Sequence, residues 1–173
     1  MRTFDSGHSP GAYDPRRMRV VLQRVRWAEV AVGEEVVGGI GPGLLALVGV
    51  AAGDEPEDAR RLARKTVRLR VLAGPERPFD LALLDRPEAA LLCVSQFTLL
   101  ADVRRGNRPS WSAAAPPETA EPLVEAYAGA VAAEGVPVAR GRFGASMAVR
   151  LENDGPVTLV LDSADLSGPR RGG

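Results

Sequence analysis

The apolar run Leu44–Val50 constrains the fold of this chain most strongly. It follows a stretch rich in glycine and proline, residues 38–43, and contains no polar side chain. A strand that alternates apolar and polar residues exposes one face to water, whereas an uninterrupted apolar strand is covered on both. The run therefore predicts a strand inside the protein, with other elements packed against each face.

Further strands are predicted on either side of this run. Residues 19–25 form one, and residues 27–37 alternate around a Gly-Glu-Glu turn, which is typical of a hairpin. Residues 89–100 predict another apolar strand, interrupted by a Ser-Gln pair. The last strands are expected at 136–139, 147–151 and 157–161.

Two helices are predicted between these strands. Asp54–Glu57 resembles a capping box with a proline in the first turn, and apolar residues follow it at helical spacing. A second helix begins near Pro117 and ends at Gly135. Because strands outnumber helices and do not alternate strictly with them, the pattern predicts an α+β fold, with both helices packed on a largely antiparallel sheet.

The chain has 173 residues, which suits one domain with a real core. Residues 1–17 carry turn residues and no apolar period, so we expect a disordered leader, with Met18 as the natural start. We expect the domain to span residues 18–163 and residues 164–173 to form a loose tail.

Composition disfavours several kinds of chemistry and location. His8 is the only histidine and lies in the polar leader, which argues against a Ser-His-Asp triad, a Cys-His pair or a His-rich zinc site. We expect no metal and no cofactor. Cys93 is the only cysteine, and we expect neither a membrane helix nor a secretion signal, which favours the cytoplasm. The formal net charge is zero, so nucleic acid would need a local basic patch.

Three segments carry residues suited to chemistry. In the first, Cys93–Asp102, the polar residues Ser95, Gln96 and Thr98 interrupt an apolar run. A buried hydroxyl or amide without a hydrogen bond costs about 1–3 kcal/mol. These residues therefore either cap the end of a strand or face a ligand carbonyl together with backbone N–H groups.

The second segment, Arg104–Trp111, combines arginines with a Gly-Asn turn and an aromatic ring. Arg104, Arg105 and Arg108 could bind phosphates while Trp111 stacks on a base. The other interpretation is a solvated loop.

The third segment is Arg142–Thr158. It overlaps residues 152–163, which predict the end of one strand, a tight turn and the start of another. Asn153-Asp154-Gly155 alone is typical of a hairpin turn. A cis bond before Pro156 would point neighbouring carbonyls the same way, as a rigid pair of acceptors. A plain turn is the alternative.

Four other side chains have simpler interpretations. Phe143 and Met147 are expected in the core or lining a pocket. Cys93, in an apolar strand without a candidate base, is expected to be a buried small hydrophobe. Arg24, inside the first strand, is either a solvated charge at an edge or a donor that positions a neighbouring loop.

Together these segments resemble the D-aminoacyl-tRNA deacylase family, also called D-tyrosyl-tRNA(Tyr) deacylases. The resemblance extends from Met18 to about Ser163. It rests on LQRV, GIGPGLLALVGV, SQFTL followed by GNRPSW, and GRFGASM leading into NDGPVT. It implies a barrel-like core, a homodimer, and hydrolysis of the ester that joins a D-amino acid to the 3′ end of tRNA.

The resemblance also implies roles for residues. Gly155 and Pro156 form a Gly-cisPro dipeptide that enters the active site of the other subunit and is steadied by Arg24. The strand end Ser95, Gln96, Phe97 and Thr98 is the implied catalytic centre. Thr98 is a candidate nucleophile, but the favoured mechanism uses the ribose 2′-hydroxyl to help activate water and main-chain amides to stabilise the oxyanion. The residues expected to support substrate binding are Asn153, Met147 and Phe143.

A steric filter suits the rejection of L-aminoacyl-tRNA. A ratio of about 10⁴ needs roughly 5.5 kcal/mol, whereas one neutral hydrogen bond supplies only about 1 kcal/mol. A rigid clash with the L side chain could supply the rest. Glycine has no side chain to clash, so glycyl-tRNA is expected to be hydrolysed as well.

Three other functions stay open at this point. The loop Arg104–Trp111 could belong to a non-catalytic RNA-binding module. A deacylase of the same fold could hydrolyse mischarged L-aminoacyl-tRNA instead. A thiol enzyme could be built on Cys93.

Overall fold

The computed structural model describes residues 17–166, and the long strand β1 (Arg19–Val32) organises it. One edge of β1 pairs along most of its length with β6 (Ala148–Asp162). The other edge pairs first with β3 (Gly43–Gly49) and then with β2 (Glu35–Ile40). All three pairings are antiparallel, and the turn between β1 and β2 confirms the predicted hairpin.

Strands β4 (Ala90–Ser95) and β5 (Val138–Arg140) extend the sheet beyond β3 through parallel pairings. They are parallel because helices connect them to the strands they pair with, and a helical crossover brings the chain back in the same direction. The predicted α+β fold is confirmed, with a mixed sheet in which three pairings are antiparallel and two are parallel. β3 is buried on both faces, as its apolar run predicts.

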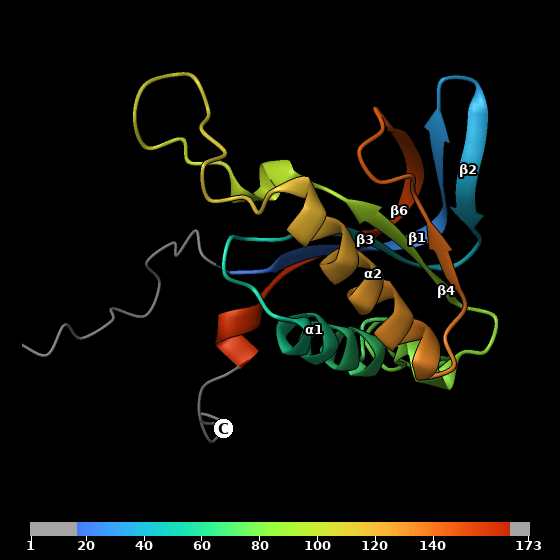
Figure 1. Ribbon diagram of the computed structural model, residues 1–173. Coiled ribbons are helices and arrows are strands. Elements are labelled where there is room, and N and C mark those ends of the chain that lie inside the picture. The colour runs from blue at the N-terminus through green and yellow to red at the C-terminus, as the bar shows by residue number, and fades with distance from the viewer. Residues whose placement is uncertain (1–16, 167–173) are drawn as a thin grey trace, which may run out of the picture.

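The sheet curls until β2 approaches β5, which nearly closes it into a barrel (Figure 1). A Cβ added to Gly38 in β2 would lie 2.4 Å from the carbonyl oxygen of Arg140 in β5, so a larger residue would push these strands apart. Apolar side chains from the strands fill the barrel, among them Val30, Leu45 and Leu92.

Helices α1 (Pro56–Arg68) and α2 (Pro117–Ala133) lie side by side against the sheet (Figure 1). Their apolar faces form a second core together with β1, β3 and β4. The buried hydroxyls of Thr66 in α1 and Tyr127 in α2 are 2.9 Å apart and hydrogen-bonded. α2 begins at the predicted Pro117 and ends at Ala133, close to the predicted Gly135. α1 begins at Pro56 as expected, but its capping box is formed by Glu55 and Asp58, one residue later than the predicted Asp54 and Glu57. Within residues 17–166, no helix is long and apolar enough to cross a membrane.

The strand predicted over residues 89–100 is shorter than expected. β4 ends at Ser95, and residues Phe97–Leu100 form the 3₁₀ turn η2. The backbone leaves the strand at Gln96, where φ is −148° and ψ is 80°. The N–H of Gln96 still donates to the carbonyl of Val48 at 2.7 Å, so the new direction is fixed to β3.

The prediction of two strands joined by a hairpin turn within residues 152–163 is wrong. β6 continues through this region, and both of its halves pair with the same strand, β1. Gln23 pairs with Thr158 and Val25 with Asn153, so β6 uses five residue steps where β1 uses two. Residues 154–157 therefore form a wide bulge opposite Arg24.

The expected leader, residues 1–17, lies outside the described residues except for Arg17. The expected tail begins inside them, because Ala164–Leu166 belong to the 3₁₀ turn η3 (Ser163–Leu166). The connection between α1 and β4 contains a third such turn, η1 (Leu83–Asp85).

Candidate active site

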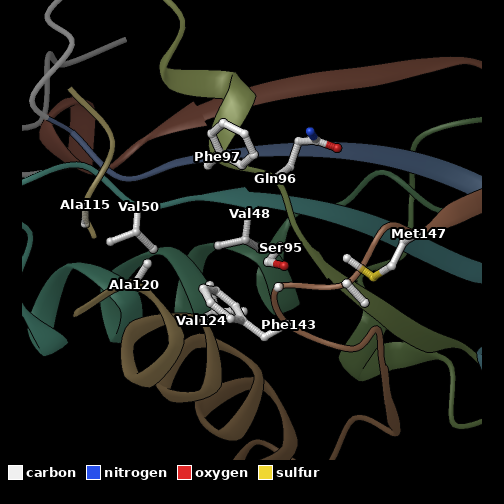
Figure 2. A pocket seen from close by; sticks show the side chains of 12 residues that line it. Val48, Val50, Ser95, Gln96, Phe97, Ala115, Ala120, Val124, Phe143 and Met147 are labelled. Atoms are coloured by element: carbon white, nitrogen blue, oxygen red, sulfur yellow. The ribbon is translucent and has the colours of Figure 1, made fainter. Parts of the chain in front are cut away.

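A pocket of about 160 Å³ opens where β4 ends, between the sheet and the first turns of α2. Figure 2 shows Ser95 among the lining side chains, with Ala120 and Val124 of α2 on one side and Met147 on the other. The full lining is Val48, Val50, Ser95, Gln96, Phe97, Ala115, Ala120, Val124, Phe143, Gly144, Ala145 and Met147.

None of these lining residues has an ionisable side chain. A side-chain general base or acid is therefore missing from the pocket wall itself, and the polar groups there are a hydroxyl, an amide and the main chain. Within the described part of the chain, no cluster of three or more His, Cys, Asp or Glu residues could hold a metal ion.

The turn η2 sets the polar rim of this pocket. Its hydrogen bonds run from the N–H of Leu99 to the carbonyl of Gln96 (3.2 Å) and from Ala101 to Thr98 (3.1 Å). The side-chain amide of Gln96 donates to the Thr98 hydroxyl. The first N–H groups of a helical turn have no acceptor within the turn. The backbone N–H at the start of η2, at Phe97, is therefore a hydrogen-bond donor next to Ser95 that η2 itself does not use.

An aromatic pair connects this rim to the loop formed by residues 102–111. The rings of Phe97 and Trp111 meet edge to face, with centroids 5.8 Å apart at 71°. Phe97 is 57% exposed and Trp111 43%, so both rings present apolar surface next to the pocket. An aromatic surface of this kind can stack on a nucleobase.

The loop is closed at its base by two backbone hydrogen bonds between Asp102 and Ser110, at 2.7 and 3.0 Å. Arg104 is bonded to the Asp102 carboxylate, and these bonds hold the pKa of that carboxyl well below its usual range. Arg105 and Arg108 lie on the exposed part of the loop. The four predicted tRNA-binding residues thus share one exposed loop that begins at the pocket rim.

The second candidate functional region, after the pocket, is the bulge in β6, where the Gly155–Pro156 peptide bond is cis. Both residues are exposed. The Asn153 side-chain amide donates to the carbonyls of Arg24 (2.9 Å) and Val157 (3.2 Å), which ties the two ends of the bulge to β1 and to each other.

Arg24 anchors the bulge to the rest of the protein. Its side chain is nearly buried, so the interpretation of Arg24 as a solvated charge at a sheet edge is wrong. Its Nε donates to the main-chain oxygen of Asp154 at 3.0 Å and lies 2.8 Å from the Asp154 carboxylate. Its Nη1 donates to the carbonyls of Val71 (2.8 Å) and Pro78 (2.7 Å), and the guanidinium lies 5.6 Å from the centre of the Phe79 ring. The bulge is therefore held to the connection that follows α1.

The structure divides the predicted residues between these two places. Ser95, Gln96, Phe97, Phe143 and Met147 line the pocket. The bulge residues and Arg24 do not line the pocket of their own chain. Sequence reasoning missed the carbonyls of Val71 and Pro78, since a backbone acceptor leaves no signature in residue identity.

Cys93 lies in β4 with its thiol buried, and this burial is the main cause that raises its pKa to about 12. Such a thiol carries almost no thiolate near neutral pH, and the thiolate is the nucleophilic form. The geometry thus disfavours an enzyme built on Cys93.

Known proteins resemble this chain over most of its length. The family model described as D-Tyr-tRNA(Tyr) deacylase matches residues 21–162. A D-aminoacyl-tRNA deacylase of Chloroflexus aurantiacus is 58% identical over 156 residues, which cover 90% of this chain and 97% of that protein. A D-aminoacyl-tRNA deacylase of Kocuria rhizophila is 54% identical over 156 residues, 90% of this chain and 100% of its own length.

Solved structures share the fold. The c-Myc DNA Unwinding Element Binding Protein superposes with a TM-score of 0.76 at 35% identity, over 83% of this chain and 97% of that one. A probable eukaryotic D-amino acid tRNA deacylase superposes with a TM-score of 0.73 at 20% identity, over 84% and 99% of the two chains, which supports the fold alone. From the matched length and the identity to its relatives, this chain belongs to the D-Tyr-tRNA(Tyr) deacylase family of enzymes.

Proposed function

We propose that the protein hydrolyses the ester bond of D-aminoacyl-tRNA and spares L-aminoacyl-tRNA. Water adds to the ester carbonyl, the bond to the ribose oxygen breaks, and a free D-amino acid and uncharged tRNA leave. We also propose that the protein hydrolyses glycyl-tRNA and that it acts in the cytoplasm, where charged tRNA is present. The reaction class is supported by relatives that are named D-aminoacyl-tRNA deacylase and match almost the full chain.

The chemical step is assigned to the main chain at the β4 end. Amides near Ser95–Phe97 stabilise the oxyanion that forms when water attacks the carbonyl. Because the pocket lining holds no ionisable side chain, the 2′-hydroxyl of the terminal adenosine helps to activate the water. Phe143 and Met147 shape the pocket around the aminoacyl ester, and Thr98 supports the turn rather than attacking the substrate.

Selection between enantiomers is assigned to the Gly155–Pro156 bulge of a second subunit. The observation that carries this assignment is an exposed dipeptide, anchored by the buried Arg24, that does not line its own pocket. Its carbonyls would accept hydrogen bonds from the substrate ammonium group and leave space only on the D side. A rigid backbone also suits an enzyme that accepts many D side chains, since the backbone does not read them.

The loop 102–111 is assigned to the tRNA. Arg104, Arg105 and Arg108 would contact phosphates near the 3′ end, and Trp111 with Phe97 would stack on an unpaired base. This assignment rests on the exposure of the loop and on its position at the pocket rim.

The decisive assay uses purified protein with matched D-Tyr-, L-Tyr- and Gly-charged tRNA, and follows release of the amino acid. We expect hydrolysis of the D-Tyr and Gly esters and survival of the L-Tyr ester. Binding of uncharged tRNA without hydrolysis of any ester would indicate an RNA-binding module instead. Preferential hydrolysis of the L ester would indicate a deacylase of the opposite chirality rule.

A mixing experiment tests whether the bulge acts across subunits. Gly155→Val places a side chain on the dipeptide, and Ala120→Phe fills the pocket, so each variant alone is expected to be inactive. If the dipeptide acts in the other subunit, random mixing gives mixed dimers with one intact site and recovers about a quarter of the wild-type activity. Absence of recovery would overturn the cross-subunit arrangement.

A further inference from the structure

Arg19 lies in a row of three residues on neighbouring strands. Along β1, it pairs in register with Gly49 of β3 on one side and with Asp162 of β6 on the other. Residues directly opposite each other in a sheet point to the same face. The Arg19 guanidinium and the Asp162 carboxylate therefore share a face with Gly49, where no side chain is present.

The turn η2 lies over the Gly49 position. A Cβ added there would meet Leu100 Cδ2 at 2.5 Å, the carbonyl oxygen of Gln96 at 3.0 Å and Leu99 Cβ at 3.0 Å. The turn therefore packs directly on the backbone of β3, next to the hydrogen bond from Gln96 to Val48. A larger residue at this position would displace the end of β4 that forms the pocket rim.

Arg19 binds both Asp162 and the turn η2. Its Nε and Nη2 bind the two Asp162 carboxylate oxygens at 2.8 and 3.0 Å, and its Nη1 donates to the carbonyl of Leu99 at 3.2 Å. The two side chains are only 16% and 20% exposed. The last carbonyls of a helical turn lack partners within it, and the Leu99 carbonyl receives its donor from a guanidinium whose plane is fixed by a bidentate ion pair.

We infer that Arg19 and Asp162 are positioning residues for deacylation. Asp162 fixes the guanidinium, the guanidinium fixes the Leu99 carbonyl, and η2 in turn fixes the amides at the pocket rim. The inference rests on the proposed function only for its effect on catalysis. Its structural part concerns the order of η2 and can be measured without substrate.

The test compares Arg19→Met and Asp162→Asn with Arg68→Met. Arg68 makes the same kind of bidentate pair, with Glu134 at 3.1 and 2.9 Å, but joins α1 to the end of α2. Amide hydrogen exchange over residues 97–101 should be faster in both test variants and unchanged in Arg68→Met. Unchanged exchange in Arg19→Met would overturn the inference, whether or not the protein hydrolyses any aminoacyl-tRNA.

Kinetics provide the second measurement, once wild-type hydrolysis of D-Tyr-tRNA is established. A misplacement of about 1 Å can cost up to 10²-fold in rate, so we expect kcat to fall about tenfold or more in Arg19→Met, with KM within about threefold. Arg19→Lys should recover only part of kcat, because an ammonium cannot make a planar bidentate pair. A normal kcat in folded Arg19→Met, or an equal loss in Arg68→Met, would contradict the catalytic part.

Discussion

The buried guanidinium of Arg24 binds Asp154 twice, through the main-chain oxygen at 3.0 Å and through the carboxylate at 2.8 Å. Asp154 immediately precedes the exposed Gly155–Pro156 dipeptide. The same guanidinium binds the carbonyls of Val71 and Pro78 in the connection after α1. One charge thus fixes the base of the bulge to the connection that follows α1.

Arg24→Met should therefore loosen the bulge and destabilise the fold. Loss of one partner of a buried ion pair costs about 3–5 kcal/mol, and because Asp154 is partly exposed we expect a loss of about 2–3 kcal/mol in the free energy of unfolding. The ratio of D-Tyr to L-Tyr hydrolysis should fall at least about tenfold. Urea unfolding and paired tRNA assays measure the two effects.

Arg150→Met is the matched control, because Arg150 forms an exposed pair with Glu29 across the same two strands. An exposed pair of this kind contributes about 0–1 kcal/mol, so stability and selectivity should stay close to those of the wild type. Full selectivity in Arg24→Met would show that the bulge keeps its geometry without this anchor.

The assignment of water activation to the substrate predicts a mild effect of Thr98→Ala. We expect activity within about tenfold of the wild type, whereas loss of a nucleophile costs about 10⁴-fold or more. A tRNA that ends in 2′-deoxyadenosine should instead react about 10²-fold more slowly, the usual contribution of a general base. Cys93→Ala, a change at a buried thiol outside the pocket lining, serves as the control with normal activity.

Phosphate binding by the loop 102–111 predicts a salt effect. The logarithm of the affinity falls as the logarithm of the salt concentration rises, and each lost phosphate contact should make this slope less steep by about 1. We therefore expect Arg108→Ala to weaken tRNA binding at low salt and to reduce this slope, as measured by titration with uncharged tRNA. Arg60→Ala, an exposed arginine on α1 that pairs with Glu57, should leave the slope unchanged. Equal slopes in all three proteins would remove Arg108 from the tRNA contact.

Asp54 predicts a pH dependence of stability. Its carboxylate accepts from the N–H groups of Met18 (2.9 Å) and Ala51 (2.6 Å), but burial outweighs these bonds and raises its pKa from 3.8 to about 6. The folded protein then holds this proton more tightly than the unfolded chain, so the contribution of the protonated form to stability is complete below about pH 4 and lost as the pH rises to about 6.

Asp54→Asn removes this titration. Relative to the variant, the wild type should lose about 1–3 kcal/mol of stability between pH 4 and pH 6, which urea unfolding at a series of pH values measures. A difference between the two proteins that does not change with pH would show that the carboxyl titrates normally in the folded state.

Local sequence patterns predict much of this molecule because they report local causes. The apolar run Leu44–Val50 gives a strand buried on both faces, and the proline with acidic residues in the first turn gives the start of α1 at Pro56. The motif around Ser95 is found at a pocket rim, as one of its two interpretations requires. In each case the side chains that carry the signal lie within a few residues of the feature they specify.

The errors have a common physical origin in long-range pairing. Asn153-Asp154-Gly155 has the composition of a hairpin turn. Whether the chain reverses there depends on which strand the following residues pair with. Here both halves of β6 meet β1, so the extra residues become a bulge. The apparent continuity of residues 89–100 fails for a similar reason, because the missing side chain at Gly49 leaves room for the chain to turn.

The sequence by itself determined most of the strands and both helices, because periodicity and helix-start signals act over short distances, and its motifs carried the family resemblance. Only the tertiary structure decided that Arg24 is buried, since its acceptors lie 47, 54 and 130 residues away. It also decided that Arg19, Gly49 and Asp162 share one row, because the registers of three strands bring them together. The partners of a charged side chain are the groups that lie near it in the folded protein, and the order of residues along the chain does not specify which groups these are.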